Sequence, residues 1–249
     1  MKKTIKVIAF LLVAIVLVAC VLSGCDIKRK LTGAEMNFPT KISNAKALSF
    51  QMNINYKKGD TTTVIDMDCY KTTNEYEEEE YAYIYTCQKG NYSSYKNIYA
   101  DDKLYEIANL PVGGIYYVKD DVSVSDDSNI LYQVTQNIML TSVAALLVKA
   151  KKETLNGEQV YRYDVEISGK NVSIWYNSEV LVQLYAKFAG ENGEPDEEYT
   201  IALSNYKIDE EISADVFARP DTYTGYVESQ ISFEAWMEII NAFAKRLGN

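Results

Sequence analysis

The chain has 249 residues, of which 25 are basic and 35 are acidic, and it contains no histidine. The lack of histidine excludes Ser-His-Asp and Cys-His catalysis and removes the commonest protein ligand of zinc. The formal net charge of −10 argues against nucleic acid as a partner. We therefore expect a protein that is not an enzyme, with no catalytic residue, no metal site and no cofactor.

The first 24 residues have the charge order of an export signal. Lys2, Lys3 and Lys6 precede an unbroken apolar run from Val7 to Leu22, which is the arrangement of a secretory signal peptide. The alternative is an uncleaved membrane anchor, but these 16 apolar residues fall short of the roughly 20 that a helix needs to span a bilayer. We predict that residues 1–24 are a cleaved signal peptide.

The tetrapeptide Leu22-Ser23-Gly24-Cys25 follows directly and resembles the lipobox of bacterial lipoproteins. A second, weaker candidate is Leu17-Val18-Ala19-Cys20, where the branched Val18 stands at a position that prefers a small residue. We predict that Cys25 carries the lipid, because two or more acyl chains of the palmitate type give stable membrane anchoring. The mature chain would then lie on the extracytoplasmic face of the cell membrane. Its 22 basic and 35 acidic residues give a net charge of −13.

The mature chain is expected to have two parts. Residues 25–44 lack a hydrophobic period and are predicted to be a lipidated tether. Residues 45–249 are long enough for a single domain with a substantial core. Its first element is a strand over residues 48–56, where apolar residues alternate with polar ones and so define one buried face.

Two reversals follow, and they place two cysteines in neighbouring strands. A tight turn at residues 57–60 would set Met52 near Ile65 on one buried face. A second reversal through residues 74–80 would bring Cys87 opposite Cys69. Opposed residues of an antiparallel pair lie close enough for a disulfide, which we predict here. Two buried free thiols remain the alternative, because cysteine packs as a small hydrophobe.

The rest of the chain reads as short strands with two helices. One helix is predicted over residues 130–152, and its apolar centre at residues 138–148 is expected to be covered on more than one side. Asn156-Gly157 fits a two-residue hairpin turn. A final helix is predicted over residues 232–247. The remaining strands are expected around residues 92–99, 103–107, 115–119, 159–167, 171–176, 180–189 and 198–208.

The order of strands and turns in the second half resembles that of a known superfamily. The similar segments are Val172–Tyr176, Val180–Phe188, Tyr199–Ile208 and the Phe-x-x-Pro ending at Phe217–Pro220. They resemble the closing strands of LolA-like lipoprotein carriers and of lipid-binding lipoproteins of mycobacterial type, over roughly residues 45–222. The resemblance implies an α+β fold, with an open, curved antiparallel sheet that forms an incomplete β-barrel. It also implies helices across the concave face of that sheet, around an apolar cavity.

The leading functional hypothesis is a non-enzymatic, membrane-anchored lipoprotein that binds a lipid or an acyl chain in the half-barrel. The two predicted helices would act as lids, with Ile138, Leu146, Trp236 and Ile240 lining the cavity. A freely diffusing carrier is not expected, because the chain itself is predicted to be lipidated. The rival hypothesis is a structural or signalling lipoprotein whose interior is filled by its own side chains. Such a protein would bind an envelope protein through its surface.

Overall fold

The computed structural model divides the chain into two units, residues 1–30 and residues 31–249, and the sheet and helices described below belong to the second. The predicted signal peptide, Cys25 and the predicted helix over residues 232–247 lie outside the described residues. Among the described residues, no helix is both long enough and apolar enough to cross a membrane. The structure describes residues 30–74, 76–86, 94–125, 129–167, 169–190, 193–220 and 223–229.

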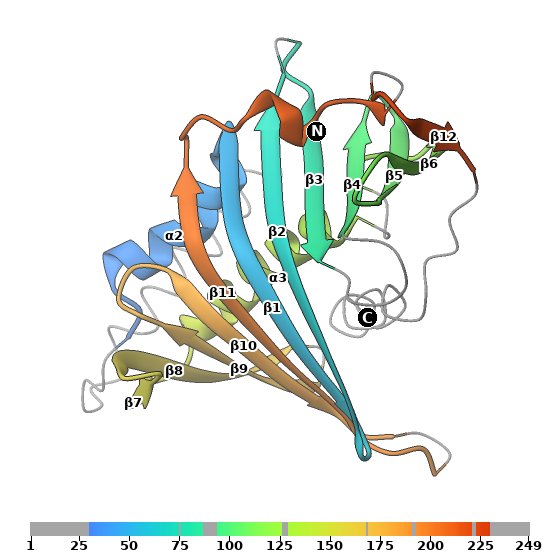
Figure 1. The fold of residues 1–249 in the computed structure, drawn as a ribbon. Coiled ribbons are helices and arrows are strands. Elements are labelled where there is room, and N and C mark those ends of the chain that lie inside the picture. The colour runs from blue at the N-terminus through green and yellow to red at the C-terminus, as the bar shows by residue number, and fades with distance from the viewer. Residues whose placement is uncertain are drawn as a thin grey trace. The chain divides into compact units, whose positions relative to one another are not determined.

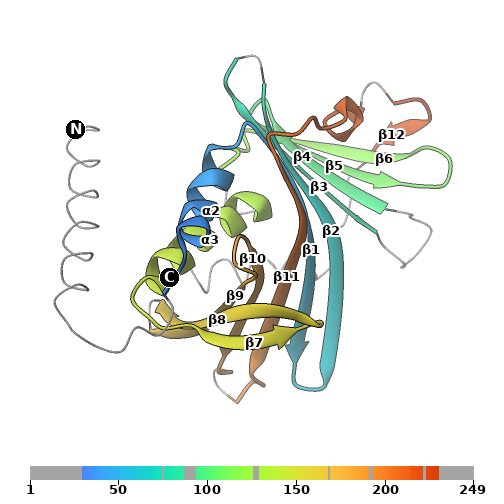
Figure 2. The same ribbon diagram turned by 90° about the vertical axis from the view of Figure 1, so that its left-hand side faces the viewer.

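The fold is one curved sheet of 12 strands, open at both ends, with two helices on its concave side. Neighbouring strands are antiparallel, except that β12 pairs with β6 in parallel. Figure 1 shows the strong curvature of the sheet, and Figure 2 shows α2 and α3 on its concave side. The predicted fold class is confirmed. The strands, in spatial order across the sheet, are β12 (Tyr226–Glu228), β6 (Gly114–Asp120), β5 (Lys103–Asn109), β4 (Ser94–Ala100), β3 (Glu79–Thr86), β2 (Thr61–Thr73), β1 (Ala47–Lys58), β11 (Glu197–Ile208), β10 (Leu181–Phe188), β9 (Lys170–Tyr176), β8 (Glu158–Ile167) and β7 (Lys151–Leu155).

The first hairpin has the predicted buried face but a different register. A two-residue turn at Gly59-Asp60 joins β1 to β2, with Gly59 at φ +58°. Met52 therefore lies opposite Met67, and not near Ile65 as the sequence suggested. The difference is a shift of two residues, which leaves the same side chains on the buried face because the side-chain period of a strand is two.

The second hairpin also has a different register, shifted by four residues, and this shift removes the basis of the predicted disulfide. Cys69 lies opposite Tyr83 and is a buried free thiol. Burial raises the pKa of this thiol well above its ordinary value. Cys87 itself lies outside the described residues. The predicted cross-strand position of Cys87 opposite Cys69 is thus wrong, because the loop at residues 74–78 reverses the chain two residues earlier than expected.

Helix α2 (Gly33–Asn44) replaces most of the predicted tether. Thr32 caps its first turn: the Thr32 hydroxyl accepts from the Glu35 N–H at 3.3 Å, and the Glu35 carboxylate accepts from the Thr32 N–H at 2.7 Å. Phe38 and Ile42 are 2% and 1% exposed in the main core. The prediction of a tether over residues 25–44 is therefore wrong from Leu31 onward, since these residues bury apolar surface against the sheet.

Helix α3 (Ile130–Ala145) ends earlier than the sequence predicted. A turn at residues 146–148 follows it, and residues 151–152, predicted as the end of the helix, belong to β7. Strand pairing explains this: Lys151–Leu155 pair with β8 through a two-residue turn in which Asn156 and Gly157 both have positive φ. The predicted turn is confirmed, and residues 151–152 pair with β8 in the hairpin that it closes.

A C-terminal segment, which we define as residues 210–229, crosses the convex face of the sheet (Figure 2). It covers a small apolar cluster of Ala82, Ile98, Ala100 and Ile107. The cluster lies on the face opposite the main core because its residues alternate with inward-facing ones along each strand. Hydrogen bonds also hold the segment to the sheet. Its partners in β3–β5 and their turns are Glu80, Lys96, Asp101 and Asn109.

Lys96 is the buried member of this interface. It is 6% exposed, and its Nζ donates to the Asp215 carbonyl at 2.7 Å and to the Tyr223 hydroxyl at 3.1 Å. Burial disfavours the ammonium form and lowers the pKa of Lys96 to about 8; the Asp215 carboxylate opposes this shift and Arg219 adds to it. The C-terminal segment is therefore docked over a buried amine whose pKa is lowered to about 8.

The Lys96 interface predicts a pH dependence of stability. Because the pKa of Lys96 is about 8 in the folded chain, against an ordinary 10.5, the unfolded chain binds more protons between these values. The contribution of Lys96 to stability should therefore rise with pH above about 8, whereas the raised pKa of the Cys69 thiol acts in the opposite direction above about 9. Urea unfolding at several pH values should therefore show the wild type gaining stability relative to Lys96→Met as the pH rises from about 8 to 10. An unchanged profile in the variant would contradict the assignment.

Candidate ligand-binding face

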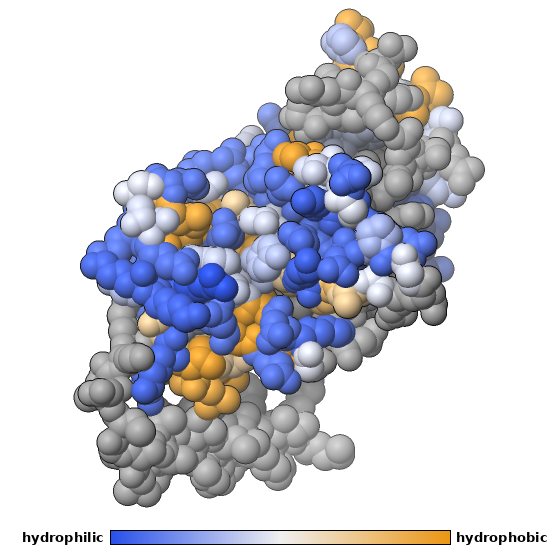
Figure 3. All heavy atoms as spheres, turned by 90° about the horizontal axis from the view of Figure 1, so that it is seen from below, coloured by the Kyte–Doolittle hydropathy of each residue, from blue (hydrophilic) through white to orange (hydrophobic). Residues whose placement is uncertain are grey.

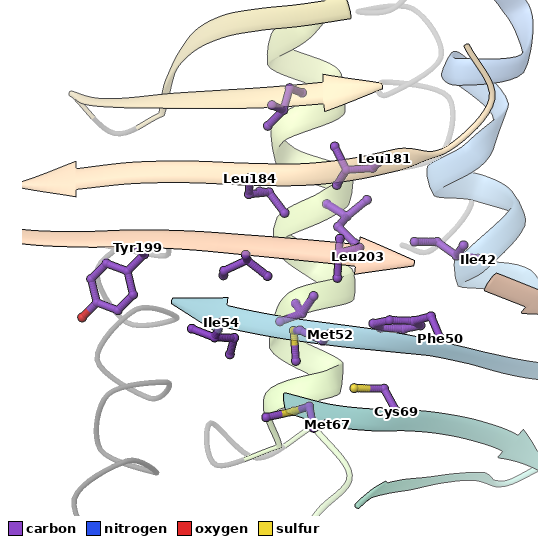
Figure 4. Close-up of a cluster of buried hydrophobic side chains, with 14 of the residues drawn as sticks. Ile42, Phe50, Met52, Ile54, Met67, Cys69, Leu181, Leu184, Tyr199 and Leu203 are labelled. Atoms are coloured by element: carbon purple, nitrogen blue, oxygen red, sulfur yellow. The ribbon is translucent and has the colours of Figure 1, made fainter. Parts of the chain in front are cut away.

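The concave face of the sheet is lined almost entirely by apolar and aromatic side chains. They come from β1 and from strands on both sides of it, and they are buried together with side chains of α2 and α3. Figure 4 shows ten of them, labelled, gathered where α3 crosses the strands. Alternation along each strand produces this surface, since every second residue points inward. The labelled residues are Ile42, Phe50, Met52, Ile54, Met67, Cys69, Leu181, Leu184, Tyr199 and Leu203.

Helix α3 lies across this face and contacts β8 and β3. Near its start, the ring of Tyr132 meets that of Tyr81 edge-on, with centroids 6.4 Å apart. In its last turns, the Ser142 hydroxyl and the Tyr176 hydroxyl share a buried hydrogen bond of 2.6 Å. Burial raises the pKa of Tyr176 to about 12, opposed by the Ser142 hydrogen bond and assisted by the charge of Glu35. The helix is thus fixed to the sheet by a ring contact at one end and a hydroxyl pair near the other.

The structure places two of the four predicted cavity residues at this face. Ile138 is 1% exposed within the main core, and Leu146 is half-buried against it. Both belong to α3 or to the turn that follows it. Trp236 and Ile240, the other two, lie outside the described residues, as does the predicted lipidation site Cys25. The described part of the face is therefore formed by the sheet with α2 and α3.

The part of the concave face on β3–β5 also carries buried polar groups that the sequence reading missed. Asn97 is fully buried, and its side-chain nitrogen donates to the Tyr83 hydroxyl at 2.7 Å. Opposite it in β5, Glu106 is 3% exposed and accepts from Lys119 at 2.7 Å. Burial raises the pKa of Glu106, and the hydrogen bond and charge of Lys119 oppose that shift. The sequence held a signal for this position: Asn97 is two residues from both Tyr95 and Tyr99, and residues two apart in a strand share a face.

Two oxygen atoms in this polar area have no hydrogen-bond partner among the described residues. They are Asn97 Oδ1 and Glu106 Oε2, which belong to directly opposed residues of β4 and β5. Unpaired buried acceptors are costly, so a donor group placed between them would be favoured. The concave face is consequently apolar over β1 and β9–β11 and has one polar spot at Asn97 and Glu106 of β4 and β5, which suits a ligand with an apolar chain and a polar end.

A separate cavity of about 590 Å³ opens on the convex face. It lies where β1 and β11 shift register between Ser49 and Gln51, beside Asn205 at φ +56°. Gln51 bridges its neighbours, donating to Asp68 at 3.0 Å and accepting from Asn205 at 2.5 Å. The sequence reading did not find this cavity, because a β-bulge depends on how two strands pair. Within the described ranges, no cluster of three or more acidic or cysteine residues could hold a metal ion.

The Ser142–Tyr176 bond gives a direct test of how α3 is held. Ser142→Ala and Tyr176→Phe should each lower the free energy of unfolding by about 1–3 kcal/mol, because each removes one hydroxyl and leaves the other buried without this hydrogen bond. The double variant should cost less than the sum of the two, since both remove one interaction. Chemical denaturation of the four proteins measures this coupling. Fully additive losses would show that the two hydroxyls do not interact.

No protein family and no curated protein matches the sequence. Solved structures do resemble it. A DUF1329 family protein from Desulfovibrio piger is 8% identical over 78% of this chain and all of that one, with a TM-score of 0.35. A LolA superfamily protein from Nitrosomonas europaea is 11% identical over 71% of this chain and 91% of its own, with a TM-score of 0.31.

LprF from Mycobacterium bovis is also similar, with 9% identity over 72% of this chain and 95% of its own and a TM-score of 0.37. The LolA superfamily protein agrees by name with the resemblance noted in the sequence. Superpositions this loose do not establish a shared site. The function is therefore inferred from the residues of this chain.

Proposed function

We propose that the protein is a membrane-anchored, extracytoplasmic lipoprotein, not an enzyme, that binds an apolar ligand against the concave face of its sheet. The observation that supports this most is the continuous apolar surface of the curved sheet beneath α3. Burying an acyl chain against such a surface is favourable at roughly 25 cal/mol per Å² of apolar area. The ligand class is a lipid or an acyl chain.

Ligand entry requires α3 to act as a lid. The described side chains of the concave face are already packed together, so a ligand must displace α3 rather than fill an open cavity. Such a displacement exchanges apolar contacts with the helix for apolar contacts with the ligand. The polar area of Asn97 and Glu106 would receive the polar end of the ligand, where an N–H or O–H donor would satisfy the unpaired oxygens.

The experiment uses the mature chain with Cys25→Ala, so that no anchor lipid confuses the measurement. Native mass spectrometry after detergent-free purification should show the chain together with a bound lipid. Titration with a fluorescent sixteen-carbon fatty acid should show saturable binding. Failure of both measurements would exclude the proposed ligand.

Adjacent residues of β10 provide a matched pair of variants. Leu184 is 2% exposed on the concave face, whereas Gln183 is only half-buried and points to the other face. Leu184→Trp should weaken fatty-acid binding by about tenfold or more, because it overfills the binding surface. Gln183→Trp should leave binding unchanged, and Leu184→Met, which conserves volume, should bind like the wild type. Equal effects at both positions would locate binding elsewhere.

A second candidate function is binding of an envelope protein through the surface. The observation that favours it is the polar cavity on the convex face, combined with a concave face that the chain fills itself. A chain that carries no lipid and binds no fatty acid, but is captured with one envelope protein, would support this function. Loss of that capture in Gln51→Ala with Asp68→Ala would place the partner at the convex cavity.

A further inference from the structure

The outer side of α3 is exposed at its C-terminal end, contrary to the expectation that this helix is covered on more than one side. Val143 is 63% exposed, and Leu147, four residues later in the turn that follows the helix, is 67% exposed. Hydrogen bonds from Leu146 N–H to the Val143 carbonyl and from Leu147 N–H to the Ala144 carbonyl hold this turn directly against the last turn of α3. Two large apolar side chains are therefore exposed near this end of the helix, and we call them the apolar pair. Seen from below, the described surface is mostly hydrophilic, with small hydrophobic patches (Figure 3).

This apolar pair lies close to the point where the anchored end of the chain enters the fold. A continuous series of contacts connects the first turn of α2 to α3. The Tyr163 hydroxyl donates to Glu35 at 3.3 Å, the rings of Tyr163 and Tyr176 are 6.1 Å apart, and Tyr176 bonds Ser142 at 2.6 Å. Val143 is the next residue. The exposed end of α3 is thus a neighbour of the start of α2.

The predicted anchor is also close in sequence. Leu31 is already buried in the core, and only five residues lie between it and Cys25. The six Cα–Cα steps from Cys25 to Leu31 span at most about 22 Å in a fully extended chain. Lipid at Cys25 would therefore hold this end of the domain near the membrane surface, whatever path the intervening residues take.

The charge of this end complements an anionic bilayer, although the mature chain as a whole is acidic. Lys28, Arg29 and Lys30 follow the predicted anchor, and Lys149, Lys151 and Lys152 follow the exposed end of α3. The three lysines after α3 are exposed. Lys151 is also paired with Asp164 at 2.8 Å. Basic residues beside an anchor are attracted to anionic lipid head groups.

We propose that the C-terminal end of α3, with Val143, Leu147 and the lysines at 149–152, rests on the lipid surface of the membrane that anchors the chain. This orientation rests on the proposed anchoring at Cys25 and adds to it a specific face. It sets the lid helix against the bilayer. An acyl chain could then pass between the membrane and the concave face without crossing water.

A photo-crosslinking amino acid at Val143 tests this orientation in the full-length, processed protein. Val64 is the matched control, because it is also a valine, is 56% exposed and lies on the opposite face of the sheet in β2. The protein is reconstituted in vesicles of phosphatidylglycerol and phosphatidylethanolamine that carry a clickable acyl chain. The probe at Val143 should crosslink lipid about tenfold more than the probe at Val64.

The outcomes separate this inference from the anchoring itself. If the protein carries a metabolic fatty-acid label but both probes crosslink lipid equally, or neither does, the orientation is wrong while the anchoring stands. A protein without the fatty-acid label would remove the anchoring. Crosslinking of Val143 to a protein in whole cells, with no lipid product, would show that this face docks on a partner and would overturn the proposal.

Discussion

Cys25→Ala should abolish incorporation of a fatty-acid probe into the protein. Lipidation requires the thiol, and processing of a lipoprotein signal follows lipidation, so the variant should also accumulate as a precursor that retains residues 1–24. Metabolic labelling with an alkyne fatty acid, followed by gel analysis and intact mass measurement, detects both effects. The expected change in labelling is all-or-none, because Cys20, the other cysteine of the signal region, follows the branched Val18 at a position that prefers a small residue.

Cys20→Ala is the control for this experiment. It removes the competing cysteine of Leu17-Val18-Ala19-Cys20 while leaving Cys25 in place. The variant should be labelled and processed like the wild type. Persistent labelling of Cys25→Ala, or its loss in Cys20→Ala, would move the modification to the other cysteine and lengthen the segment before the fold by five residues.

Ile54→Ala should lower the free energy of unfolding by about 2–5 kcal/mol. Ile54 is 1% exposed in β1, near the centre of the concave face, and its side chain points toward the crossing helix (Figure 4). The substitution removes buried apolar atoms and leaves a cavity that a twelve-stranded sheet cannot easily close. Such a loss is a large share of the 5–15 kcal/mol typical of a folded domain. Denaturant titration of the mature chain measures it.

Two controls separate packing from strand propensity. Ile54→Val removes one methylene and should cost only about 0.5–1.5 kcal/mol. Val64→Ala changes an exposed residue of the same hairpin, which pairs with Asn55 next to Ile54, and should have a much smaller effect. Similar losses for Ile54→Ala and Val64→Ala would show that the concave face is not the hydrophobic core.

Helix α2 shortens the segment between the predicted lipidation site and the fold. Because the fold begins at Leu31, lipid at Cys25 would hold the domain by a short connection and not by a tether that reaches residue 44. A short connection limits the orientations that the domain can adopt at a membrane. The same helix places Glu35 and Tyr163 in contact in the interior, which links the entry point of the chain to the sheet beneath α3.

The sequence by itself determined the features that depend on neighbouring residues. The predicted signal and lipobox are linear motifs, the alternation from Leu48 to Tyr56 identified the buried face of β1, and Asn156-Gly157 identified a hairpin turn because both residues accept positive φ. Helix α2 also had a local signal, the Thr32-x-x-Glu35 capping box. Pro39 and the lack of a clear apolar period concealed it.

Only the tertiary structure decided which segments meet. A slip of two residues between β1 and β2, or of four residues between β2 and β3, preserves every buried face, so the hydrophobic pattern could not distinguish Cys69 opposite Tyr83 from Cys69 opposite Cys87. The end of α3 depended on the pairing of β7 with β8, which competes with helix formation at Lys151. The convex cavity and the parallel pairing of β12 with β6 arise from long-range contacts. Local propensity does not encode such contacts, because their free energy comes from burying surfaces of distant segments together.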